Sequence, residues 1–115
     1  MEVQSHKGIY TVDFDDECIE RFSAYDLETT HFIVDRKVAQ LYSEQLQTVL
    51  KAPSVLLLDA LENNKSVEKF PDYIEFLAGK YIRRNHTLVA IGGGIIQDIT
   101  SFLAATILRG VEWKF

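Results

Sequence analysis

Apolar residues along the chain occur in two patterns that alternate: short unbroken runs, and longer stretches with helical spacing. The unbroken runs lie at residues 31–34 (HFIV), 54–58 (SVLLL) and 87–91 (TLVAI). Runs of this length with little polar alternation are typical of strands that are buried on both faces. We therefore predict three buried strands, and residues 111–115 (VEWKF) add a fourth segment of strand character.

Between these runs, apolar residues recur three or four positions apart, as on one face of an α-helix. The spacing predicts helices over residues 38–50, 67–84 and 95–109, although Pro71 suggests a second start of the middle helix near Phe70. Gly110 follows the last helix in the C′ position that favours glycine. Alternating strands and helices of these lengths predict a parallel sheet with right-handed crossovers and helices on both faces. The expected fold class is therefore α/β, a Rossmann-like parallel sheet with flanking helices.

The N-terminal part of the chain has a third pattern, in which apolar and polar residues alternate. Alternation over residues 8–14 and 17–25 is typical of half-exposed antiparallel strands. Asp15 and Asp16 stand between the two segments and favour a turn. We predict an N-terminal β-hairpin that precedes the α/β domain.

Composition narrows the class of protein. The 115 residues suffice for one domain with its own core, and 47% of them are hydrophobic. The net charge is −5 and the 12 basic residues are scattered, which argues against nucleic acid as a partner because backbone binding needs a concentrated basic face. No apolar run approaches the ~18 residues that a membrane helix needs, so no membrane partner is expected.

The cysteine content and the end of the chain carry two further expectations. Cys18 is the only cysteine, so no internal disulfide can form, and we expect a buried thiol in a protein of the reducing cytoplasm. The chain stops on strand-like residues with no helix after them. We therefore expect residues 1–115 to be a fragment of a longer protein.

A run of three glycines, Gly92 to Gly94, separates the third strand from the last helix. The run matches neither GxGxxG nor the P-loop pattern. A strand, a glycine turn and a helix N-terminus in this order can hold an anion such as a pyrophosphate against exposed backbone N–H groups. A tight structural connection explains the same glycines equally well, so both interpretations stay open.

The carboxyl ends of parallel strands share one edge of a sheet, and ligands of such sheets bind there. Asp35, the polar loop 59–65 and the glycine turn should therefore lie on one rim, a combination that suits a dinucleotide. Asp35 could bind a ribose or cap the helix that follows it. Asp98, in the first turn of the last helix, could interact with the helix dipole or with a ligand hydroxyl or amide.

The other polar candidates have simpler explanations. Glu62 and Lys65 could belong to a solvated loop, and Arg109 could stabilise the C-terminal end of the helix dipole. The three histidines are dispersed in the sequence without metal-ligand spacing, and we expect them at strand edges: His6, His31 and His86. We predict no metal site, and no nucleophilic triad is recognisable.

The segment 92–113, GGGIIQDITSFLAATILRGVEW, resembles the signature of the 3-dehydroquinate synthase family: three glycines, three residues, Asp, then a helix of small residues that ends in Arg-Gly-Val. Two weaker stretches occur in the expected order. Val34-Asp35 with Val38 resembles the Thr-Asp…Val segment of the family, and residues 62–66 (ENNKS) resemble its Glu-x-x-Lys-Ser/Thr loop. The resemblance covers about residues 32–115.

The resemblance implies that residues 1–115 are the N-terminal NAD-binding domain of such an enzyme, without the helical C-terminal domain that binds metal and substrate. In this interpretation Asp35 would hold the adenosine ribose. Gly93, Gly94 and Ile95 would cradle the pyrophosphate.

The same resemblance assigns the remaining roles. Glu62 and Lys65 would contact the cofactor near its nicotinamide end, and Asp98 would bind the nicotinamide ribose or amide. Arg109 would reach the substrate across the interface of a homodimer. The divalent metal, zinc or cobalt, would be held by the C-terminal domain, and no catalytic residue is expected within this chain.

The reaction that the family name implies converts 3-deoxy-D-arabino-heptulosonate 7-phosphate into 3-dehydroquinate with elimination of phosphate. Two departures from the family pattern are Gln97 before Asp98, and residues 59–61 (DAL) in place of the usual glycine before Glu62. Related sugar-phosphate cyclases, such as 2-deoxy-scyllo-inosose synthase and sedoheptulose 7-phosphate cyclases, share this signature. A non-catalytic Rossmann-like interaction module is the alternative from a different class.

Overall fold

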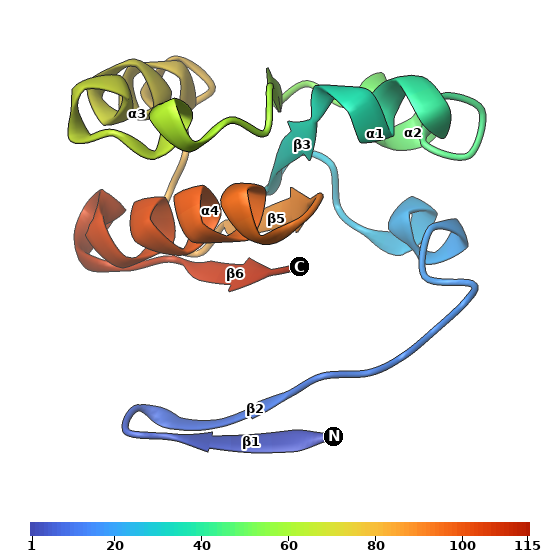
Figure 1. The fold of residues 1–115 in the computed structure, drawn as a ribbon, viewed down its shortest axis with the longest axis horizontal. Helices are drawn as coiled ribbons and strands as arrows, with labels where there is room; N and C mark the ends of the chain where they lie inside the picture. Colours follow the sequence, from blue (N-terminus) through green and yellow to red (C-terminus); the bar gives the residue numbers. More distant parts are fainter.

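The structure is a computed structural model that describes the backbone of residues 1–115 and every side chain except that of Ser23. Four strands form its main sheet: β3 (Thr30–Asp35), β4 (Val55–Leu58), β5 (Thr87–Ile91) and β6 (Glu112–Lys114). They pair in the order β4-β3-β5-β6, and every pair is parallel (Figure 1). The predicted α/β fold with a parallel sheet is confirmed.

The strand order places a reversal at β3. The chain first moves from β3 to β4 on one side, then crosses back over β3 to β5 and continues to β6. Where the direction reverses, the connections leave the carboxyl ends of β3 and β5 toward opposite faces, and a crevice opens between them. The two central strands therefore meet at a topological switch point.

Four α-helices flank the sheet: α1 (Arg36–Leu41), α2 (Gln47–Leu50), α3 (Phe70–Gly79) and α4 (Gly94–Thr106). Right-handed crossovers put the connection from β3 to β4 on one face and the two later connections on the other, because the chain moves across the sheet in opposite directions. Accordingly, α1 and α2 pack on one face, and α3 and α4 on the other. Among the described residues, no helix is long and apolar enough to cross a membrane.

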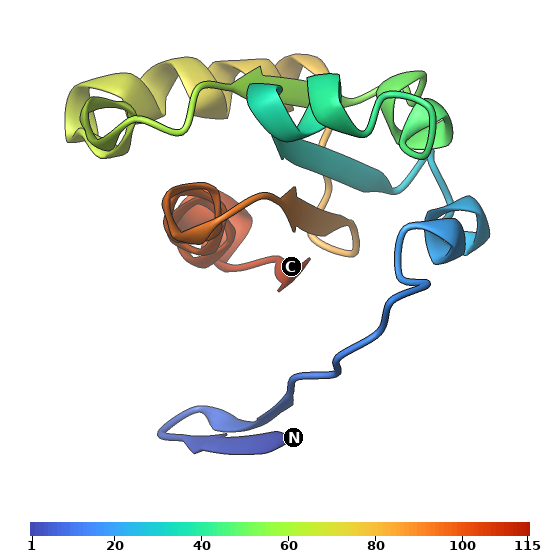
Figure 2. The ribbon, with the colours of Figure 1, turned by 45° about the vertical axis from the view of Figure 1, so that its right-hand side comes forward.

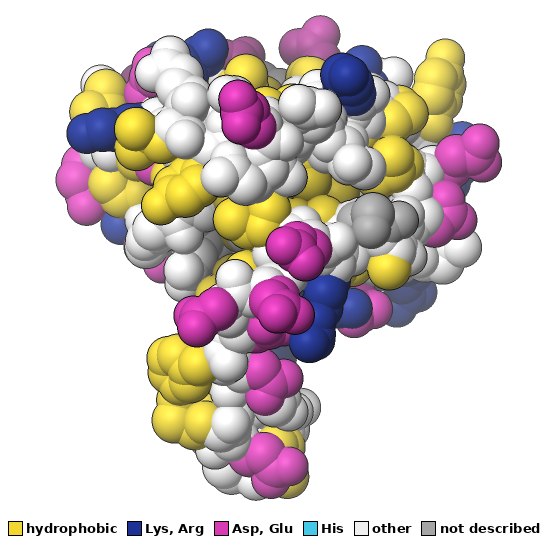
Figure 3. All heavy atoms as spheres, turned by 90° about the vertical axis from the view of Figure 1, so that its right-hand side faces the viewer, with side chains coloured by type: hydrophobic (Ala, Val, Ile, Leu, Met, Phe, Trp, Pro, Cys, Tyr) yellow, Lys and Arg dark blue, Asp and Glu magenta, His cyan; other side chains and the backbone are white. Residues whose placement is uncertain are grey.

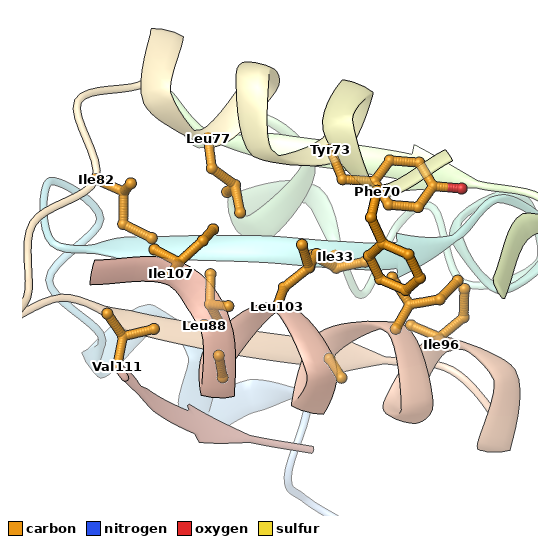
Figure 4. Packing of buried hydrophobic residues seen from close by; sticks show 13 residues of the cluster. Ile33, Phe70, Tyr73, Leu77, Ile82, Leu88, Ile96, Leu103, Ile107 and Val111 are labelled. Atoms are coloured by element: carbon orange, nitrogen blue, oxygen red, sulfur yellow. The ribbon is translucent and has the colours of Figure 1, made fainter. Parts of the chain in front are cut away.

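The larger core lies between the sheet and the pair α3 and α4 (Figure 4). Ile33 and Leu88 from the two central strands face Leu77 of α3 and Leu103 of α4, and all four side chains are fully buried. Burial of a side chain of this size contributes roughly 1.5–3 kcal/mol. This apolar layer fixes α4 against β5, and so sets the direction in which the N-terminus of α4 points.

The smaller core lies on the opposite face and corrects one prediction. Residues 17–25 form turns and the 3-10 helix η1 (Glu20–Ala24) rather than a strand. Ile19, Phe22 and Tyr25, which recur every three residues, pack on this core with Leu46 and Val49. Their period of three suits a 3-10 helix, in which residues three apart share a face.

The N-terminal hairpin exists, but between different strands. It joins β1 (Glu2–Ser5) to β2 (Gly8–Thr11), and it stands apart from the rest of the molecule in Figures 1 and 2 and as a narrow protrusion in Figure 3. The backbone of Gly8 has φ +133°, which favours glycine at the turn. Cys18, predicted to be buried, is exposed in the segment beyond the hairpin.

Three helix boundaries also differ from the predictions. The helix predicted at 38–50 is interrupted between α1 and α2, and α3 ends at Gly79, five residues before the predicted end. The helix predicted to end at Gly110 stops at Thr106, followed by the 3-10 turn η4 (Ile107–Arg109). The C-terminal end of α4 is closed by a hydrogen bond in which the Val111 N–H donates to the Ala104 carbonyl (2.8 Å).

His31, which is buried in β3, and His86, which is half-buried just before β5, form a hydrogen-bonded pair at the amino ends of the central strands. The Arg83 backbone N–H donates to His86 Nδ1 (3.2 Å), so that nitrogen is an acceptor. His31 Nε2 then donates to the same nitrogen (2.9 Å), and the Ser54 hydroxyl lies within hydrogen-bond distance of His31 Nδ1 (2.6 Å).

Burial, followed by the electrostatic influence of the neighbouring His86, lowers the pKa of His31 from its ordinary 6.5 to about 4. As pH falls below 6.5, the unfolded chain takes up a proton that the folded chain refuses until about pH 4. Unfolding experiments in urea between these pH values should therefore show a loss of up to roughly 3 kcal/mol of stability. His31→Gln should reduce the slope of the unfolding free energy against pH by about one proton, whereas the exposed His6→Gln should leave that slope unchanged. Equal slopes in the two variants would refute the assignment of this pH dependence to His31.

Candidate functional site

The predicted rim is present at the carboxyl edge of the sheet. A Cβ placed on Gly92 would lie 3.0 Å from the Cβ of Asp35, so the ends of β5 and β3 are in close contact. On the other side of β3, Arg36 Nε donates to Asp59 Oδ1 (3.2 Å), which joins the end of β3 to the end of β4. The three loops that were expected to converge therefore do so.

The glycines of the turn differ in what surrounds them. A Cβ on Gly92 would lie 2.8 Å from Cγ1 of Ile96, and the backbone there has φ +157°, so only glycine fits. A Cβ on Gly93 or Gly94 would meet nothing within 4 Å. Gly92 is thus required by packing, whereas Gly93 and Gly94 border open space where a ligand can approach the backbone.

The N-terminus of α4 opens into the same space. Gly93 is its N-cap and offers no side-chain acceptor, and the first helical bond runs from the Gln97 N–H to the Gly93 carbonyl at 3.1 Å. The N–H groups of the first turn, including that of Ile95, have no partner within the helix. Unpaired donors at the positive end of a helix dipole suit an anion such as a phosphate.

Glu62, Lys65 and Asp98, which are separated in the sequence, meet beside this helix terminus. Lys65 Nζ lies 2.9 Å from Asp98 Oδ2 and 3.4 Å from Glu62 Oε2. The hydrogen bond to Asp98, followed by that to Glu62, raises the pKa of Lys65, which therefore stays protonated. Through Lys65, an ion pair connects loop 59–65 to Asp98 of α4. The last four residues of the loop form the 3-10 helix η2 (Glu62–Lys65).

Asp35 caps the helix that follows it, which is one of the two interpretations that the sequence left open. Its Oδ1 accepts a hydrogen bond from the Lys37 backbone N–H at 2.8 Å, and it is the N-cap of α1. The second carboxylate oxygen has no partner among the described residues. Asp35 can therefore cap α1 with one carboxylate oxygen and still accept a hydrogen bond from a ligand with the other.

Arg109 is the predicted site residue that the structure does not bring to the rim. It follows α4 at the opposite end from the glycine turn, and no hydrogen bond or ion pair holds its side chain among the described residues. Leu108 and Arg109 have φ of 50° and 65°, in the left-handed region that non-glycine residues rarely adopt. Arg109 nevertheless remains in the last, C-terminal turn after α4, where the sequence placed a basic residue.

Two residues of the site were missed in the sequence. Asn64 Nδ2 donates to the Asp59 carbonyl (2.7 Å), and the Tyr73 hydroxyl donates to the Asn64 carbonyl (2.9 Å). Both bonds depend on the path of the backbone in loop 59–65, which no sequence pattern specifies. Among the described side chains, no three His, Cys, Asp or Glu residues group closely enough to hold a metal ion.

The sheet order and the helix arrangement define a Rossmann-like α/β domain with a glycine turn at its switch point. The family model described as 3-dehydroquinate synthase N-terminal matches residues 55–114, more than half of the chain. The chain therefore belongs to the 3-dehydroquinate synthase family, and it corresponds to the N-terminal domain.

Curated relatives agree with this assignment. The 3-dehydroquinate synthases of Staphylococcus aureus strains Newman and JH9 are each 27% identical to the chain over 108 residues. The match covers 90% of this chain and 30% of each relative, so the chain spans less than a third of their length.

The different surroundings of the glycines predict different effects on stability. Gly92→Ala should lower the free energy of unfolding by about 1–3 kcal/mol, because the new methyl group overlaps Ile96 and Asp35. Gly93→Ala should change it by less than about 0.5 kcal/mol, because its methyl group enters open space. Urea unfolding of both variants measures the difference, and equal losses would contradict the division of roles.

Proposed function

We propose that this chain is the NAD-binding domain of a 3-dehydroquinate synthase-like lyase. The observation that carries the proposal is the open space at Gly93 and Gly94, which lies against the unpaired N–H groups of α4. The pyrophosphate of NAD is a doubly charged anion of the kind that such a terminus binds. The class of reaction is inferred from the family and from the names of the relatives.

The residues on the rim suit the other parts of the cofactor. Gly93, Gly94 and Ile95 would hold the pyrophosphate through backbone N–H groups, and the unpaired oxygen of Asp35 would accept from the adenosine ribose. Glu62 and Lys65 would contact the nicotinamide end. NAD, when bound, supplies reversible hydride transfer, and the protein contributes its position and its electrostatic surroundings.

The charge of Asp98 fits this proposal through its partner. A carboxylate close to a phosphate site is unfavourable when it stands alone. Lys65, protonated and 2.9 Å from Asp98, offsets that charge, and Asp98 keeps an oxygen for the nicotinamide ribose or amide. Lys65 therefore orients the carboxylate and screens it from the pyrophosphate.

The remaining parts of the reaction belong to the complete enzyme. We propose that its substrate is 3-deoxy-D-arabino-heptulosonate 7-phosphate, that a zinc or cobalt ion held by a C-terminal domain activates it, and that the product is 3-dehydroquinate. Arg109, exposed and without a partner, would contact the substrate from the other subunit of a homodimer. The single cysteine and the biosynthetic family support a cytoplasmic location.

Calorimetric titration of NAD into the complete gene product tests the proposal. Wild-type protein should bind NAD, and Gly93→Ala should weaken binding at least about tenfold, because its methyl group occupies the space that the pyrophosphate needs. Asp98→Ala should also weaken binding, because it removes the ligand-facing carboxylate and frees Lys65.

The exposed hairpin residue Tyr10 provides the control, and Tyr10→Phe should bind NAD like the wild type.

Release of phosphate from the heptulosonate phosphate should depend on added NAD. Absence of NAD binding by the wild type, together with an inert Asp98→Ala change, would disprove the cofactor role. Phosphate release from a different sugar phosphate only would assign the chain to another cyclase.

A further inference from the structure

Loop 59–65, which carries Glu62 and Lys65, is held by bonds that its own sequence does not explain. The Asn64 side chain closes the loop on itself by donating to the Asp59 carbonyl (2.7 Å). The loop is then attached to α3 by the Tyr73 hydroxyl, which donates to the Asn64 carbonyl at 2.9 Å. The Asn64 carbonyl belongs to the peptide bond that joins Asn64 to Lys65, so this hydrogen bond restrains the backbone next to the lysine.

Tyr73 is itself fixed to α4 through aromatic contacts. Its ring meets that of Phe70 edge to face, with centroids 5.6 Å apart, and the Phe70 ring lies 4.5 Å from that of Phe102. Tyr73 is only 6% exposed and Phe70 only 7%. Aromatic pairs at these distances have defined geometry, so the Tyr73 hydroxyl has little freedom to move.

These contacts form a closed ring. Phe102 lies one helical turn after Asp98 on α4, so both residues project from the same side of that helix. From Asp98 the ring runs through Lys65, across the Asn64 carbonyl to Tyr73, and back through Phe70 to Phe102. Four of its members, Asp98, Lys65, Phe70 and Phe102, also line a groove of about 210 Å³ together with Val67 and Ile99.

We propose that Tyr73 is a positioning residue of the cofactor site, whose hydroxyl holds loop 59–65 so that the Lys65 ammonium stays against Asp98 at the edge of this groove. This inference rests on the proposed function. A lysine side chain is long and flexible, and ordering it costs conformational entropy. A backbone fixed next to Lys65 reduces that cost before any ligand binds, which strengthens binding through preorganisation.

The Tyr73 hydroxyl has one acceptor among the described residues, the Asn64 carbonyl. Tyr73→Phe removes this hydrogen bond and leaves the ring contacts in place. Loss of one hydrogen bond of this kind corresponds to roughly a three- to tenfold change in an equilibrium constant. We expect Tyr73→Phe to weaken NAD binding by about that factor, while the exposed Tyr10→Phe leaves it unchanged.

A double-mutant cycle separates positioning from a general structural role. Calorimetry on the complete gene product compares wild type, Tyr73→Phe, Lys65→Met and the double variant. If Tyr73 acts through Lys65, the Tyr73→Phe change should have almost no effect on NAD affinity in the Lys65→Met background. An equal loss in both backgrounds would overturn the inference, as would an unchanged affinity of Tyr73→Phe.

Hydrogen exchange in the absence of NAD supplies a second readout. The amides of residues 62–66 should exchange faster in Tyr73→Phe than in the wild type and should be unaffected by Tyr10→Phe. Unchanged exchange in Tyr73→Phe would contradict the proposed attachment of the loop. Failure of the wild type to bind NAD would instead overturn the proposed function, and the role of Tyr73 in cofactor binding with it.

Discussion

The close contact between the ends of β3 and β5 is the constraint on which the candidate site depends. Gly92 lies so near Asp35 and Ile96 that a methyl group has no room there. This contact brings the cap of α1 and the N-terminus of α4 to the same point of the rim. A larger residue would push the two strand ends apart.

The core on the opposite side of α4 supports this contact. Leu103 and Ile99 are fully buried against the central strands and α3, so the helix cannot rotate without losing apolar burial. The same packing determines where Asp98 and Phe102 project. The ion pair with Lys65 and the aromatic contact with Phe70 are therefore consequences of how α4 sits on the sheet, and together they fix the loop that carries Glu62.

Much of this arrangement could be predicted, because apolar periodicity determines which segments are strands or helices and because parallel sheets collect ligand loops at one edge. Asp35 and the glycine turn were placed on the rim for that reason. The strand predicted at 17–25 is wrong because Ile19, Phe22 and Tyr25 recur every three residues, which suits a 3-10 helix and not a strand. The end of the last helix differs from the prediction because the backbone of Ile107 is extended, so α4 stops before Gly110. The roles of Tyr73 and Asn64 could not be predicted, because hydrogen bonds from side chains to a loop backbone depend on the three-dimensional course of that loop. The histidine pair could not be predicted either, because its two residues are 55 positions apart and meet only across adjacent strands.

An NMR titration of the ¹⁵N-labelled gene product with NAD, in which every backbone amide is followed, tests cofactor binding at the glycine turn most directly. The largest shifts should occur at Gly93, Gly94 and Ile95, with smaller shifts in loop 62–65 and at Asp35, while the amides around His31 and His86 at the opposite edge of the sheet stay in place. Shifts that cluster at that opposite edge, or no saturable shift at the glycine turn, would contradict the account.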